Sequence, residues 1–124
     1  MDIIKKDENG IKKYYRGNKV AVIISPGYGC GWFSEHPAGE DYKEHPLFSP
    51  TIVQLILDHQ IGYKSDNFIS NFTSELERIF PNAYFDGLND AYIEWIPVGT
   101  YIRIANYDGA ETLIKYHEDN YEKV

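Results

Sequence analysis

Five consecutive apolar residues, Val20 to Ile24, place the tightest constraint on how this chain can fold. Most of them are β-branched, which favours a strand over a helix. A strand that carries no polar residue on either face is typical of one covered by other elements on both sides. We therefore predict a strand over 19–25 that is buried on both faces.

A glycine-rich segment, Pro26 to Trp32, follows this strand directly. Its three alternate glycines do not suit a helix or a regular strand, so we predict a sharp turn. A buried strand leading into glycines is also found in phosphate-binding loops. Here no Lys-Ser/Thr pair follows, and no helix begins directly after the glycines, so neither nucleotide-binding fingerprint is present. A turn that lets Trp32 pack closely is the plainer interpretation.

Two helices are predicted in the middle of the chain. The first has Ser49 as its N-cap and Pro50 at its first position, a favourable start, and it runs to about His59. The second spans 65–80 and has Ser65 as its N-cap. Apolar residues recur along it at helical spacing, so one stripe faces a core; they are Phe68, Ile69, Phe72, Leu76, Ile79 and Phe80.

The C-terminal part predicts a three-strand meander over 91–96, 101–107 and 111–116, followed by a polar end that frays over 117–124. Residues 1–18 are predicted to be a basic arm or a marginal hairpin around Asn9-Gly10. The fold class that follows is α+β. A small, mostly antiparallel sheet, built from the first strand and the meander, packs against the two central helices in one domain over 19–124.

Charge is unevenly distributed along the chain, whose net charge is -7. Residues 1–19 hold six basic and three acidic side chains, and the remaining residues hold six basic and sixteen acidic ones. The body therefore carries about -10 and the first segment about +3. Such a body repels phosphates, so direct binding of nucleic acid is not expected.

Several kinds of site are not supported by the sequence. Cys30 is the only cysteine, so no internal disulfide and no cysteine-based zinc site is expected. The acidic loop after Trp32, which also holds His36 and His45, lacks the spacing of a metal site. A Cys30–histidine pair has nothing to orient it, so an enzyme is not supported either. With no signal peptide and no apolar run that could span a bilayer, we expect a cytoplasmic protein without cofactor.

Four pieces of the chain resemble a family of small, uncharacterised proteins encoded by phages and prophages. The first piece is Val20 to Trp32, a strand followed by a Ser-Pro-Gly-Tyr-Gly-x-Gly-Trp turn. The others are Phe48-Ser49-Pro50, then 81–87, then Trp95 to Thr100 with the Tyr-Asp-Gly-x-Glu piece that ends at Glu111. The resemblance covers about residues 20–116. It implies a mobile-element origin and an accessory role towards a host system.

Two classes of function follow. In the first, the protein acts without catalysis by binding and inhibiting a host protein, in the manner of anti-defence and anti-CRISPR proteins, whose target presents a basic nucleic-acid-binding surface. The expected contacts are Glu35, Glu40, Asp41, Glu44, Tyr101 and Tyr107. In the second, the chain binds or sequesters a small nucleotide-like ligand, with contacts from Gly27, Tyr28, Gly29, Gly31, Trp32 and Arg103. Pairing of an exposed meander strand with a second copy would give a homodimer.

Overall fold

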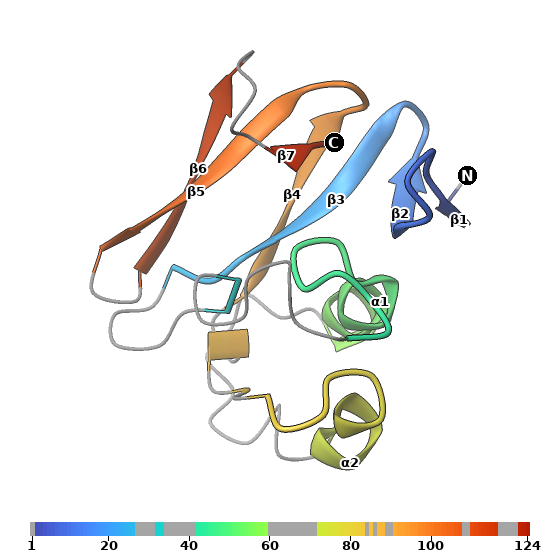
Figure 1. The fold of residues 1–124 in the computed structure, drawn as a ribbon, viewed down its shortest axis with the longest axis vertical. Helices are drawn as coiled ribbons and strands as arrows, with labels where there is room; N and C mark the ends of the chain where they lie inside the picture. The colour runs from blue at the N-terminus through green and yellow to red at the C-terminus, as the bar shows by residue number, and fades with distance from the viewer. Residues whose placement is uncertain are drawn as a thin grey trace.

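The computed structural model describes residues 2–26, 32–33, 42–59, 72–83, 85, 87–88, 91–107, 110–116 and 122–124. Within these ranges the chain forms seven strands and two helices (Figure 1). The strands are β1 (Asp2–Lys6), β2 (Lys12–Arg16), β3 (Lys19–Ile24), β4 (Tyr92–Pro97), β5 (Tyr101–Tyr107), β6 (Ala110–Tyr116) and β7 (Glu122–Lys123). The helices are α1 (Pro50–His59) and α2 (Thr73–Glu77).

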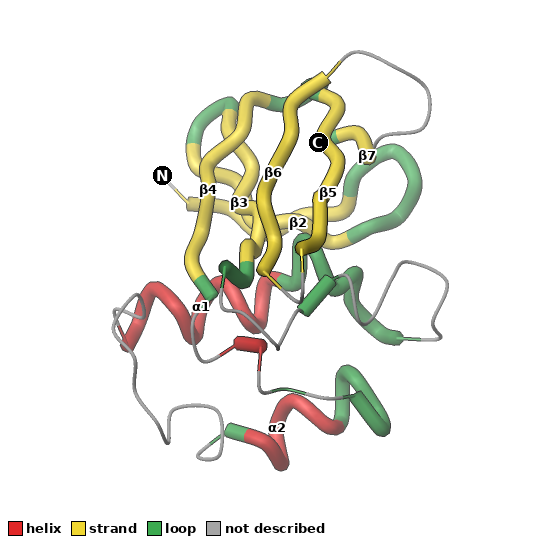
Figure 2. Tube along the Cα trace, turned by 90° about the vertical axis from the view of Figure 1, so that its left-hand side faces the viewer, coloured by secondary structure: helices red, strands yellow, loops and turns green. Residues whose placement is uncertain are grey.

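The strands form two antiparallel sheets, with orders β1-β2-β3-β4 and β6-β5-β7. The helices lie on one side of the strands, and α2 lies farther from them than α1 in both views (Figures 1 and 2). The α+β class predicted from the sequence is therefore confirmed.

Strand β3 is the centre of the core, as its apolar sequence predicts. All its residues from Val20 to Ile24 are fully buried. Alternate side chains, Ala21 and Ile23, pack with residues of α1 and α2. The others, Val20, Val22 and Ile24, pack with Ile102 of β5 and with other residues on that side. The period-two alternation of a strand thus supplies one core towards the helices and a second core towards the other sheet.

The predicted three-strand meander is wrong. Strand β4 pairs with β3 along its whole length, from Lys19 opposite Pro97 to Ile24 opposite Tyr92, whereas β5 and β6 belong to the other sheet. The chain changes sheet at a turn where Gly99 has φ +90°. This arrangement covers both faces of β3, which a single sheet with helices on one side would leave half exposed.

The two ends of the chain also take part in the sheets. Residues predicted as an arm or a hairpin form the β1–β2 hairpin, and β2 continues the sheet beside β3. The Asp7 carboxylate accepts hydrogen bonds from the main-chain N–H groups of Asn9 (2.8 Å) and Ile11 (2.9 Å), which fixes the turn. At the other end β7 pairs with β5, and Val124 is only 4% exposed. The predicted fraying is therefore wrong for residues 122–124.

Helix α1 begins as predicted, because the Ser49 hydroxyl accepts a hydrogen bond from the N–H of Ile52 at 3.3 Å. The second helix is shorter than predicted in the part that is described, since α2 ends at Glu77 and Ser65 to Asn71 lie outside the described residues. Of its predicted apolar stripe, Leu76 and Phe80 are fully buried and Phe72 and Ile79 are half-buried, while Phe68 and Ile69 lie outside the described residues. Neither helix described here has the length and hydropathy needed to cross a membrane.

Candidate functional site

One buried carboxylate holds both ends of the glycine-rich segment. Glu111, near the start of β6, is 3% exposed. Its Oε1 accepts a hydrogen bond from the N–H of Ser25 at 3.1 Å, and its Oε2 accepts one from the N–H of Trp32 at 2.9 Å. Its own N–H donates to the carbonyl oxygen of Ser25 at 2.8 Å. The carboxylate therefore connects the end of β3, the residue after the glycines, and β6.

The side chains at both ends of the segment point into the protein. The Ser25 hydroxyl donates to the carbonyl oxygen of Gly87. The Trp32 indole N–H donates to the carbonyl oxygen of Pro46 at 2.7 Å, and its fully buried ring lies against the rings of Phe80 and Phe85. Trp32 thus serves as a core residue, which is the plainer of the two interpretations of the sequence.

The residues predicted to bind a nucleotide are only in part described. Gly27, Tyr28, Gly29 and Gly31 lie outside the described residues. Arg103 is exposed on β5, whereas the ring of Trp32 is enclosed by the core. The Glu111 carboxylate, which accepts hydrogen bonds from Ser25 and Trp32 on either side of the glycines, carries a negative charge that repels a phosphate. Sequence reasoning missed Glu111, since a lone glutamate after Asp-Gly resembles ordinary strand surface.

The residues predicted to bind a protein partner are likewise only in part described. Glu35, Glu40 and Asp41 lie outside the described residues, and so does the side chain of Tyr107, while Tyr101 is half-buried on β5. The Glu44 carboxylate accepts hydrogen bonds from the Ser49 hydroxyl and from the N–H and hydroxyl of Thr51 (3.2 and 2.9 Å). It therefore stabilises the N-terminus of α1, where the helix dipole favours a negative charge.

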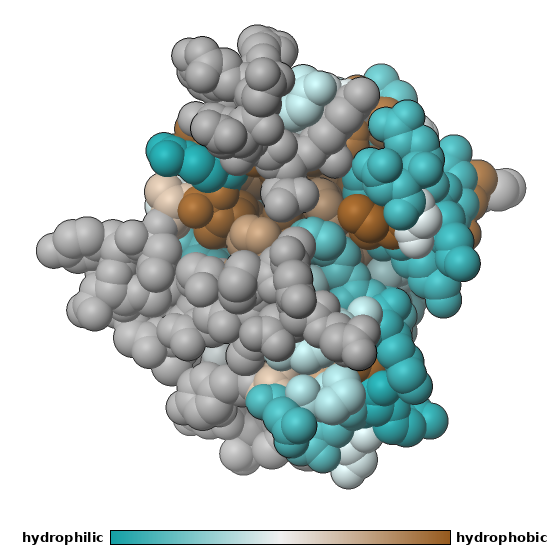
Figure 3. Space-filling model, in the orientation of Figure 1, coloured by the Kyte–Doolittle hydropathy of each residue, from teal (hydrophilic) through white to brown (hydrophobic). Residues whose placement is uncertain are grey.

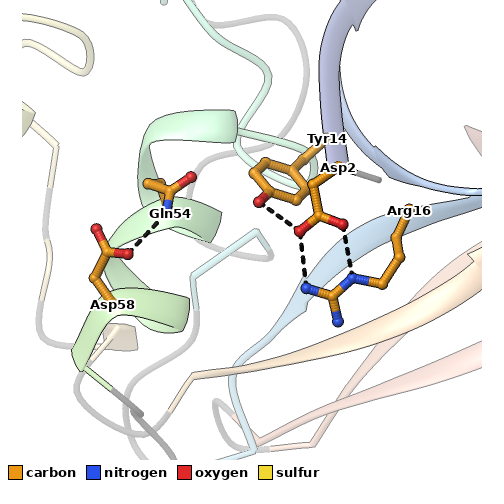
Figure 4. Close-up of polar contacts among 5 residues, drawn as sticks. All are labelled: Asp2, Tyr14, Arg16, Gln54 and Asp58. Carbon is orange, nitrogen blue, oxygen red and sulfur yellow. Dashed lines mark hydrogen bonds and ion pairs between the residues drawn. The ribbon is translucent and has the colours of Figure 1, made fainter.

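A groove beside the N-terminal hairpin is the acidic surface that the structure does describe. It has a volume of about 450 Å³ and is lined by residues of β1, β2, α1 and α2. Glu44, Asp58 and Glu75 contribute carboxylates to it, and among the described residues Lys12 is the one basic side chain that lines it. Exposed Ile4 forms part of its wall. Asp58 is held by the Gln54 amide at 2.7 Å (Figure 4).

The opposite face of the hairpin carries a different set of charges. A second groove, of about 640 Å³, is lined among others by Lys5, Lys6 and Lys13 with Asp7 and Glu8. Lys13 is 2% exposed, and its Nζ lies 2.8 Å from the Asp7 carboxylate and 4.5 Å from the centre of the Phe48 ring. Its charge is therefore already compensated inside the protein.

Half-buried His45 lies close to this pair. Its Nδ1 accepts a hydrogen bond from the N–H of Leu47 at 3.1 Å, and its ring packs against those of Phe33 and Phe48. Burial, assisted by the charge of Lys13, lowers the pKa of His45 to about 4, so the imidazole is neutral at pH 7. In the part of the chain that is described, no group of three or more His, Cys, Asp or Glu residues is placed to hold a metal ion.

Similarity to known proteins adds nothing to this description. Comparison of the chain with protein-family models, with curated proteins and with solved structures found no significant match.

Proposed function

We propose that this protein acts without catalysis, by binding a protein partner that presents a basic surface. The observation that carries the proposal is the groove between the hairpin and the helices, whose described lining holds Glu44, Asp58 and Glu75 and a single lysine, Lys12. Given the resemblance to phage and prophage proteins, we propose that the partner is a host protein with a basic nucleic-acid-binding surface and that binding inhibits it.

Electrostatics and apolar contact both support this groove as the contact surface. The chain carries a net charge of -7, so a basic partner is attracted before contact and associates faster. The exposed carboxylates of Asp58 and Glu75 lie beside apolar Ile4 and Leu55. An apolar strip next to charged residues is typical of protein interfaces, in which apolar area contributes affinity and charge contributes orientation.

The test compares charge reversals that differ only in position. Asp58→Lys and Glu75→Lys change the groove, whereas Glu77→Lys makes the same change on α2 at an exposed residue that does not line it. Asp58 lies in the last turn of α1, where a lysine suits the helix dipole, so Asp58→Lys should not destabilise the helix. Unfolding curves of all three variants check this.

The readout is the affinity of each variant, as a function of salt concentration, for a host protein isolated by its binding to the unmodified chain. We expect Asp58→Lys and Glu75→Lys each to weaken binding about tenfold at low ionic strength, with a smaller difference at high salt, and Glu77→Lys to bind like the unmodified protein. Equal binding by all three variants would rule out the groove as the contact surface.

A nucleotide-binding function is the second candidate. It has one observation in its favour, namely that Glu111 anchors the glycine-rich segment at both ends, as a ligand-binding loop requires. The burial of Trp32 and the negative charge of Glu111 oppose it, because they remove a stacking surface and repel phosphate. We therefore rank it below partner binding.

A further inference from the structure

Strand β1 has an open edge. It is the outermost strand of its sheet, and within the described residues it pairs only with β2. All five of its residues are exposed, and they include Ile3 (50% exposed) and Ile4 (52% exposed). In Figure 3, the side of the molecule where Figure 1 places the hairpin is mostly hydrophilic, with hydrophobic atoms at its outer margin. An open edge that carries large apolar side chains is a template for another strand.

The register of the hairpin determines which main-chain groups face this edge. Asp7 lies opposite Ile11, and its N–H donates to the Ile11 carbonyl oxygen at 2.9 Å. Hydrogen-bonded pairs alternate along an antiparallel ladder, so Lys5 and Ile3 also direct their main-chain groups towards β2. The N–H and C=O groups of the other residues of β1, namely Asp2, Ile4 and Lys6, therefore point outward.

We propose that β1 pairs antiparallel with β1 of a second copy, with Ile4 opposite Ile4 of the partner subunit and Asp2 opposite Lys6 of the partner subunit. Hydrogen-bonded pairs form only between residues whose main-chain groups both point outward. This register uses Asp2, Ile4 and Lys6 of both copies and allows about six main-chain hydrogen bonds. Shifting one strand by two residues would leave some of these outward-facing residues without a hydrogen-bonding partner.

Charge selects this pairing over others. Lysines on an edge strand normally oppose association, and a parallel pairing in register would place Lys5 and Lys6 opposite the same residues of the partner. The antiparallel register instead places Lys6 opposite a carboxylate. Asp2 is already oriented, because its oxygens accept hydrogen bonds from Arg16 (3.0 and 2.9 Å) and from the Tyr14 hydroxyl (2.8 Å), as Figure 4 shows.

The pairing of the two β1 strands ends at a dimer and places the acidic grooves of both copies on one side of the joined sheet. The two-fold axis stands perpendicular to the joined sheet, so α1 of both copies lies on the same side of it. The two Ile4 side chains then lie next to each other, between the acidic grooves of the two copies. Each copy uses its only β1 edge, so the contact ends at a dimer and does not continue into a fibre.

Two cysteine variants test the register directly. Ile4→Cys places two thiols opposite each other across the axis, at a Cα separation of about 5.5 Å, within the range that a disulfide bridges. Ile3→Cys is the matched control, because it is equally exposed but its two copies lie diagonally, about 7–8 Å apart. The unmodified chain, with Cys30 alone, gives the background. Under mild oxidation we expect the disulfide between two copies of Ile4→Cys to form at least about tenfold faster than that between two copies of Ile3→Cys. Peptide mass mapping identifies which cysteines are joined.

Two charge variants test the energetics by sedimentation equilibrium. Lys6→Glu places an acid opposite Asp2 twice in each dimer and should weaken dimerisation about tenfold. Lys5→Glu changes the net charge equally but faces Ile3 of the partner subunit, so it should weaken dimerisation less. A monomer at every concentration would overturn the proposal. So would equal crosslinking of the two cysteine variants, or equal dimerisation of the two charge variants, whether or not a host partner binds.

Discussion

Replacing Glu111 by glutamine tests how strongly the carboxylate stabilises the fold. A hydrogen bond to a charged group contributes about 1.5–3 kcal/mol, and Glu111 accepts two from main-chain N–H groups. The amide of Glu111→Gln keeps one acceptor oxygen but turns an NH2 group towards the other N–H, which leaves a buried donor without an acceptor. We expect the free energy of unfolding to fall by about 2–4 kcal/mol, a large part of the stability of a domain of this size.

The assay is equilibrium unfolding in urea, with Glu94→Gln as the matched control. Glu94 is a half-buried strand glutamate that accepts one hydrogen bond, from the Tyr92 hydroxyl at 3.0 Å. Because glutamine can still accept that bond, we expect a loss below about 1 kcal/mol. Hydrogen exchange gives a second readout. The Ser25 and Trp32 amides should exchange faster in Glu111→Gln, while the Ile23 amide, which donates to the Leu47 carbonyl oxygen, should change least.

A small change in stability would refute this role of Glu111. If the free energy of unfolding of Glu111→Gln lies within about 0.5 kcal/mol of that of the unmodified protein, the carboxylate does not connect the glycine-rich segment to β6 in solution. Faster exchange at Ile23 as well as at Ser25 would point to general loosening of the sheet rather than loss of one anchor.

Two further outcomes follow from half-buried His45 and fully buried Leu76. The folded-state pKa of His45 is depressed to about 4, so the unfolded chain takes up the proton first and the free energy of unfolding should fall as the pH drops from 6.5 towards 4. His45→Asn can keep the hydrogen bond from the Leu47 N–H without titrating, so unfolding of this variant should depend less on pH over that range. Leu76→Ala should lower the free energy of unfolding by about 2–5 kcal/mol, because Leu76 is fully buried. Glu77→Ala, at the next and exposed position, should change it by no more than about 0.5 kcal/mol, and thermal or urea unfolding distinguishes the two.

Features with a local cause were predictable from the sequence. The run from Val20 to Ile24 in β3 has no polar side chain, so its sequence alone predicts burial on both faces of the strand. Ser49 and Pro50 begin α1 because a hydroxyl and a fixed φ act on the next few residues only. The ends of β5 at Tyr101 and Tyr107 coincide with turn-forming residues on either side.

The choice of strand partners was not predictable in the same way. Only a few residues separate β4 from β5 and β5 from β6 in the sequence, and only the second two strands pair with each other. The difference depends on β3, which lies far away in the sequence and needs a partner on its second edge. The burial of Val124 is also non-local, because Val124 packs in one core cluster with residues of β3, β4 and β5. A single apolar residue among polar neighbours gives no periodic pattern from which its burial could be predicted.

The acidic groove escaped prediction for a related reason. Asp58 and Glu75 lie on different helices and Ile4 lies on the first strand, so no spacing connects them until the chain folds. The sequence pointed instead to the continuous loop that holds Glu35 and Glu40, because a run of acids is visible without a structure. Glu44 belongs to both sets, since its carboxylate lines the groove and also stabilises the start of α1.

In the four pieces from which a phage or prophage family is predicted, several described residues have main-chain roles. Glu111 binds the N–H groups of Ser25 and Trp32, Ser49 caps α1, Asn82 has φ +62° and Gly99 has φ +90°. Each of these roles shapes the main chain and would persist whatever the protein binds. The proposed contact surfaces rest on β1, which lies outside the resemblance, and on exposed side chains of the helices. Membership of that family stays a prediction, and on this argument it would imply a shared fold while leaving each member free to bind a different partner.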